Sequence, residues 1–297
     1  MSADGAVGYG EIYDRGYQHY DGPRLGRLHA VWALARYSMG RALGFRKPWT
    51  AKVIPILLYV AVLVPVVVSV GVRAFLAQML PGVNLLDYPE YFAGVFLILG
   101  IFVATITPEM LCPDRQERVL PLYFSRAITR GDYVVGKLLA AALLTLTVSF
   151  VPAAIMWVGR QLLEPSPLQA FRDHLDDLGR IAVAGGLMAA YLGAIGLAIS
   201  SFTGRKSVAV GVIILGFLLT EFLTGALTFA LEGNSAVQRW LLFLSPSRTC
   251  AALVSGLWGV ETGDPLMDHS VPVVAAGMVV VTLACLGVMA WRYRSRD

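Results

Sequence analysis

The chain has 297 residues, of which 57% are hydrophobic and 15% are charged, and its formal net charge is +4. Soluble domains carry about 25% charged residues, so this composition excludes an ordinary soluble protein and indicates a polytopic membrane protein. The basic residues flank long apolar blocks and form no patch with interleaved aromatic residues, so no nucleic-acid partner is expected.

Residues 1–52 contain no long apolar block, so we expect a cytoplasmic segment without a cleavable signal peptide. Within it, apolar residues recur at steps of three and four and predict an amphipathic helix. These residues are Leu28, Trp32, Ala35, Met39 and Ala42. Arg27 and Arg41 are expected to point away from the apolar face, with Arg36 at its rim. Such a helix suits the inner membrane surface, either as an anchor or as an element that also contacts a cytoplasmic partner.

Six apolar blocks approach or exceed the roughly 20 residues that cross about 30 Å of hydrocarbon. They are Val53–Val72, Phe92–Leu111, Val134–Gly159, Ile181–Phe202, Val208–Leu231 and Val271–Trp291. If the N-terminus is inside, 18 of the 24 basic residues lie on that side, so the positive-inside rule places both termini in the cytoplasm. We therefore expect an all-α integral protein of the cell membrane, with a six-span domain at 53–291 and a short tail at 292–297.

The loop between the second and third spans, at 112–133, combines a short apolar helix near 120–124 with many charges. The charged residues around that helix are Glu109, Asp114, Arg115, Glu117, Arg118, Arg126 and Arg130. Apolar residues bracketed by charges suit a helix that docks in a groove of another protein, because burial gives affinity and charge gives register. The alternative is a solvated loop.

The fourth span carries small residues one turn apart, at Gly185, Ala189 and Gly193. Small residues let another helix approach closely in a membrane. The stripe can pack within one bundle, which we favour, or at a subunit interface.

Glu221 is the one charged residue of the stretch Ser207–Leu231. A charge at bilayer depth costs about 2.5–3.5 kcal/mol on insertion scales, so such a residue faces protein or water. We expect Glu221 to lie on a substrate path or a subunit seam, or to form a structural hydrogen bond with a nearby Thr or Ser.

From Glu109 to Lys137 the chain presents Glu, Asp-Arg, Leu, Ser-Arg, Ile, Arg, Asp-Tyr and Gly-Lys in order, and this run resembles type-2 ABC transporter permeases. The similarity extends to the N-terminal helix, the six spans and the outer loop 232–270, where Pro246 follows Leu-Ser. The resemblance implies a coupling helix within 109–130 that contacts an ATPase subunit. It also implies a pair of short re-entrant helices near Gly233–Val260, before the last span.

A nucleotide-binding loop is missing, since the nearest approach, Thr203–Ser207, lacks the first glycine and the Gly-Lys pair. We therefore expect no cofactor in this chain, with ATP and Mg²⁺ bound by a separate ABC ATPase. Two copies of each subunit, surrounded by lipid, would form an exporter that works by alternating access. Lipids, hydrophobic drugs and peptides all suit an apolar path.

Two other classes of protein remain as alternatives. An ion-coupled transporter or channel would use Glu221 as a relay, but the sequence has no evident internal repeat and no second deep charge. An intramembrane enzyme needs a nucleophile with a base, or metal ligands. The four histidines, His19, His29, His174 and His269, lie outside the predicted spans, so no catalytic or metal site is expected.

Overall fold

The computed structural model describes residues 22, 25–45, 47–76, 86–124, 128–231, 235–260, 264–267 and 269–294. Within these ranges every regular element is a helix, and six helices are long and apolar enough to cross a membrane. They are α2 (Thr50–Leu76), α3 (Tyr88–Gln116), α5 (Arg130–Leu162), α7 (Leu175–Ser200), α8 (Lys206–Ala230) and α11 (Val271–Arg294). The prediction of an all-α membrane protein with six spans is confirmed.

The spanning helices extend beyond the apolar blocks that predicted them. The helix α3 continues to Gln116, and α5 begins at Arg130 after an N-cap in which Thr129 accepts a hydrogen bond from the backbone N–H of Asp132. The predicted loop 112–133 is therefore partly helical, and α4 (Leu120–Phe124) is the short helix between the two spans.

The N-terminal helix α1 (Arg27–Ala42) packs against α5 and α3, with Leu34, Ala35 and Ser38 among its buried residues. Leu28, at the start of the predicted apolar face, is 86% exposed. Only the later part of that face is therefore covered by protein, and a position at the membrane surface stays a prediction. The expectation that Arg41 points away is wrong: its side chain turns into the protein toward a buried carboxylate.

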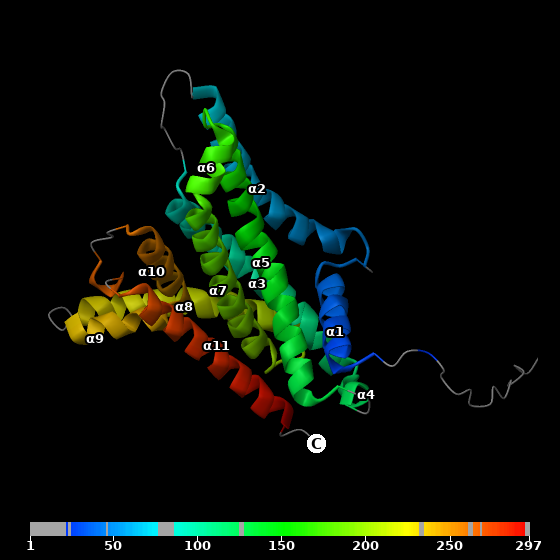
Figure 1. The fold of residues 1–297 in the computed structure, drawn as a ribbon. Helices are drawn as coiled ribbons and strands as arrows, with labels where there is room; N and C mark the ends of the chain where they lie inside the picture. The colour runs from blue at the N-terminus through cyan, green and yellow to red at the C-terminus, as the bar shows by residue number, and fades with distance from the viewer. Residues whose placement is uncertain are drawn as a thin grey trace, which may run out of the picture.

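The pair α5 and α7 has the most extensive helix packing in the described chain, and α3 packs against both. By contrast, α2, α8 and α11 bury only a small part of their apolar surface in this chain. Figure 1 shows α1, α4 and the C-terminal end of α11 gathered at one end of the molecule, and α6 (Pro167–Asp173) toward the other. We call the first of these the α1/α4 end.

Before the last span, the chain forms a sharply bent helix pair. The segment α9 (Ser235–Trp240) continues into η1 (Leu241–Leu244), and α10 (Pro246–Trp258) follows at 109°. Ser245 stands at the bend, where its hydroxyl accepts a hydrogen bond from the backbone N–H of Arg248. The short helix η2 (Pro265–Met267) then leads to α11. This is the position at which the resemblance implied two short re-entrant helices.

The small residues of α7 face α5 of the same chain. A Cβ on Gly185 would lie 3.2 Å from Ser149 Oγ, one on Gly193 would lie 3.4 Å from Ala141 Cβ, and Ala189 is buried. The arrangement matches packing within one bundle. Among the glycines of α7, Gly196 lies closest to another helix, although the stripe did not include it: a Cβ there would lie 2.5 Å from Val103 Cγ1 on α3.

We expect Gly196→Ala to lower the thermal stability of the protein in detergent. The added methyl would overlap Val103 and Thr107, and overpacking of this kind costs about 1–3 kcal/mol. The matched control is Gly186→Ala on the same helix, where nothing lies within 4 Å of the added Cβ. Gly186→Ala should leave the melting temperature unchanged or raise it, because alanine is the better helix former. Equal melting temperatures for the two variants would contradict this packing.

Candidate functional site

The α1/α4 end is organised around the carboxylate of Asp114, near the end of α3. Lys137 Nζ on α5 lies 2.7 Å from Asp114 Oδ2, and Arg41 Nη2 on α1 lies 2.8 Å from Asp114 Oδ1. The hydroxyl of Tyr133 donates a hydrogen bond of 2.8 Å to Asp114 Oδ2. The side chains of Asp114 and Lys137 are fully buried. We call these four residues the Asp114 network.

The two cations of the Asp114 network also donate to neutral oxygens. Lys137 Nζ donates to Ser38 Oγ at 3.0 Å and to the carbonyl of Met110 at 2.8 Å, and Arg41 donates to the same carbonyl at 2.8 Å. Moving an ion out of water costs several kcal/mol, which a partner of opposite charge and further hydrogen bonds offset. The network therefore holds only while α1, α3 and α5 keep this arrangement.

Further ion pairs surround the Asp114 network. Glu109 on α3 pairs with Lys47, which precedes α2. Its Oε2 also lies 2.7 Å from Nζ of Lys206, at the start of α8. Arg27 at the start of α1 pairs with Asp132 of α5 at 2.8 Å. These pairs join α1, α3, α5 and α8 at the same end of the molecule.

Arg41 on α1 and Tyr123 on α4 lie outside the spanning helices and have shifted pKa values. Burial opposes the charge of Arg41, but the charge and hydrogen bond of Asp114 outweigh it, so the pKa of Arg41 is raised. Burial and, next, the charge of Asp114 raise the pKa of Tyr123 on α4. Arg41 therefore stays charged and Tyr123 stays a neutral phenol near pH 7.

The residues predicted to dock an ATPase fall into two groups. Glu109 and Asp114 are engaged within the chain, and Arg115 donates to the carbonyl of Ser201 at the end of α7. Glu117 and Arg118 are exposed beside α4. Arg130 donates to the carbonyl of Arg294 on α11, at 3.1 Å, and Arg126 lies outside the described residues. Direct contact with a partner thus stays a prediction, with Glu117 and Arg118 the most accessible members.

Sequence reasoning did not find the partners of Asp114. In the sequence, Tyr133 and Lys137 stand out only as part of the run that carries the family resemblance, and Arg41 is expected to point away from the apolar face. One feature of the sequence could have indicated the network: Lys137 is a basic residue in an otherwise apolar run of α5. A basic residue there requires an acidic partner of similar depth.

Glu221 joins α8 to the bent helix pair. Its Oε1 lies 3.0 Å from Arg248 Nε of α10, and Ser245 at the bend donates its hydroxyl to Oε2. Arg248 also lies 3.7 Å from Asp264, through Nη1 and Oδ2. A hydrogen bond with a nearby serine was one of the expected environments, whereas the ion pair with Arg248 was not predicted.

A comparison of the sequence with known protein families gives a match over nearly the whole chain. A family model described as ABC-2 family transporter protein matches residues 3–297, which include the Asp114 network, α4 and the bent helix pair. A search of curated proteins found no match. In the described part of the chain, no group of three or more His, Cys, Asp or Glu side chains is placed to hold a metal ion.

We expect Asp114→Asn to destabilise the protein strongly. The substitution leaves the charges of Lys137 and Arg41 buried together, and removing one partner of a buried ion pair costs about 3–5 kcal/mol. The measurement is thermal unfolding of the purified chain in detergent. The control is Asp176→Asn, which removes an exposed ion pair with Arg180 and should cost less than about 1 kcal/mol. Similar losses in the two variants would contradict the assignment of the Asp114 network.

Proposed function

The chain belongs to the ABC-2 family of transporter permeases, and on this premise we propose that it is the membrane subunit of an ATP-driven exporter. The family comprises membrane transport components that are not themselves catalytic and generally work with an ABC ATPase subunit. In the proposed complex, two permeases assemble with two ATPases, which bind the ATP and Mg²⁺. The permease lies in the cell membrane with both termini in the cytoplasm, as the distribution of basic residues supports.

The observation that carries this proposal is a chain of contacts from α4 to the Asp114 network. The rings of Tyr123 and Phe124 on α4 lie 5.9 and 6.0 Å from the ring of Tyr133, and Tyr133 donates to Asp114. A displacement of α4 is therefore passed to a side chain that is bonded to the buried charges. From there it reaches α1, α3 and α5.

In the proposed mechanism, ATP brings the two ATPases together and displaces α4. The ends of α1, α3 and α5 move as one body, because their separation would leave Asp114 and Lys137 buried without partners. The extensive packing between α5 and α7 carries the motion along the spans. Alternating access in a pair of permeases then moves an apolar substrate such as a lipid, a hydrophobic drug or a peptide.

The exposed surface of α8 supports assembly with a second copy. Its large apolar side chains Leu215, Leu218, Leu219 and Phe222 are exposed in this chain, and a membrane or another protein must cover them. Glu221 lies on the same helix, where its ion pair with Arg248 holds the bent pair against α8. These contacts favour a structural role near the seam over the alternative of an ion relay.

We expect Glu221→Gln to lower thermal stability modestly and to leave ATP-driven transport active. Glutamine keeps the shape and can still accept from Ser245, but it loses the charge that faces Arg248. The expected loss is below about 2 kcal/mol, because both side chains are partly exposed. The measurement is uptake of a fluorescent lipid or drug into inverted vesicles that contain both subunits. Transport that depends on a pH gradient without the ATPase, and that Glu221→Gln abolishes, would favour the ion-coupled alternative.

The docking proposal is tested by charge reversal beside α4. We expect Arg115→Glu with Arg118→Glu to reduce co-purification of the ATPase by about tenfold, because reversed charges at the exposed rim of an interface oppose association, here by about 1.4 kcal/mol. Arg118→Glu alone is the cleaner variant, since Arg115 is also bonded to Ser201 within the chain.

The matched control for the reversal is Arg172→Glu, an exposed arginine on α6. Figure 1 shows α6 toward the opposite end of the molecule from α4. It should leave co-purification unchanged, and all variants should insert into the membrane at the wild-type level. Unaltered ATPase association after reversal of Arg118 would overturn the docking assignment. Loss of association in the control as well would show that the effect is one of net charge.

A further inference from the structure

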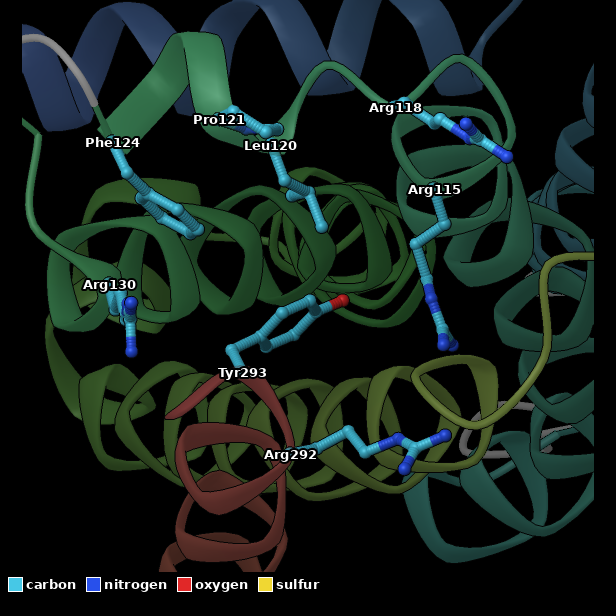
Figure 2. Close-up of a pocket in the computed structure, with 8 residues that line it drawn as sticks. All are labelled: Arg115, Arg118, Leu120, Pro121, Phe124, Arg130, Arg292 and Tyr293. Atoms are coloured by element: carbon cyan, nitrogen blue, oxygen red, sulfur yellow. The ribbon is translucent and has the colours of Figure 1, made fainter. Parts of the chain in front are cut away.

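A cavity of about 370 Å³ lies at the α1/α4 end, between α4 and the C-terminal end of α11. Figure 2 shows the residues that line it, with the ring of Tyr293 between Leu120 of α4 on one side and Arg292 on the other. The lining residues are Arg115, Arg118, Leu120, Pro121, Phe124, Arg130, Arg292 and Tyr293. Half of these are arginines and none is acidic, while α4 supplies an apolar wall. The cavity thus combines a strongly cationic rim with an apolar surface.

Among the residues that the structure describes, two buried polar groups of this cavity have no hydrogen-bond partner of normal geometry: the hydroxyl of Tyr293 and the Nε of Arg292. Tyr293 is only 6% exposed. Figure 2 shows the Tyr293 hydroxyl directed into the cavity, toward the side where Arg115 and Arg292 lie. Buried donors without partners cost free energy, so this pair points to an acceptor that fills the cavity.

The position of the cavity is that of a membrane surface. Arg292 and Tyr293 are in the last turns of the spanning helix α11, and the neighbouring Trp291 is 62% exposed, as expected of an interfacial tryptophan. Further along α11, Leu283 and Val280 present an exposed apolar surface. A ligand with an anionic head in the cavity could therefore lay acyl chains against α11.

We propose that this cavity binds the phosphate headgroup of an anionic phospholipid. Guanidinium groups bind phosphate oxygens through paired hydrogen bonds, and the Tyr293 hydroxyl supplies one more donor. The assignment to the cytoplasmic leaflet, where anionic lipids concentrate, rests on the orientation proposed above. The lipid would lie between α4 and α11 and contact both, so it would stabilise the position of α4, which the ATPase is proposed to move.

Two other occupants share part of this chemistry. A free phosphate would use the arginines but gain nothing from the apolar wall of α4 or from α11. A carboxylate from the ATPase would pair with the arginines, yet the cavity lies at the membrane end of the spans, beside Trp291. Both occupants are distinguished from a lipid by the experiment below.

The experiment titrates the purified full-length permease, without the ATPase, with phosphatidylglycerol and with phosphatidylcholine of the same acyl chains. Bound lipid is counted by native mass spectrometry. We expect phosphatidylglycerol to bind about tenfold more tightly. Arg292→Gln should weaken that binding about tenfold and Tyr293→Phe about threefold, because the first variant removes a charged donor and the second removes one uncharged hydroxyl donor. The chain alone is tested, so failure of the ATPase proposal would not affect the result.

The matched control is Arg294→Gln, which removes the same charge two residues further along α11 from a side chain that does not line the cavity. It should leave phosphatidylglycerol affinity within about twofold of wild type. If binding depended only on surface charge, Arg294→Gln would weaken it as much as Arg292→Gln does. Equal affinity for the two lipids, or equal losses for Arg292→Gln and Arg294→Gln, would overturn the proposal. If inorganic phosphate displaced phosphatidylglycerol at a concentration equal to that of the lipid, the site would be assigned to a free anion. If Arg292→Gln leaves lipid affinity unchanged but loses the ATPase in a separate co-purification, the site belongs to the partner protein.

Discussion

The buried carboxylate of Asp114 is the constraint on which the α1/α4 end depends. Lys137 is fully buried beside it and Arg41 reaches it from the N-terminal helix, so the positions of α1, α3 and α5 are linked by charge. If one member left, the remaining charges would stay in the low-dielectric interior without a partner of opposite sign. The N-terminal helix is therefore part of the folded body, and its position at the membrane surface stays a prediction.

This constraint explains how a helix of five residues can matter to the whole chain. The helix α4 has little surface of its own, but its aromatic residues rest on Tyr133, which is bonded to Asp114. On its other side, α4 forms the apolar wall of the cationic cavity beside α11. The proposed ATPase contact, the buried charges and the proposed lipid thus meet at one element of the permease.

The fold was largely predictable because span length and apolar composition are properties of short stretches of sequence. The six spans, α4 and the bent pair before α11 all lie where the pattern or the resemblance placed them. The site was less predictable because its bonds join distant residues. Arg41 and Asp114 are 73 positions apart, and an amphipathic pattern treats any arginine on the polar face as solvent-facing. Glu221 stands out in the sequence as the one charge of its span, but its ion pair with Arg248 depends on how α10 folds back on α8.

The most direct test of this account is a spin-label distance measurement in the complex with the ATPase. Labels at the exposed residues Leu28 on α1 and Val135 on α5 report on the body held by the Asp114 network, and a label at Phe229 reports on the far end of α8. The account predicts that ATP leaves the distance from residue 28 to residue 135 unchanged while the distance from 135 to 229 changes. A change between 28 and 135 on ATP binding would contradict it.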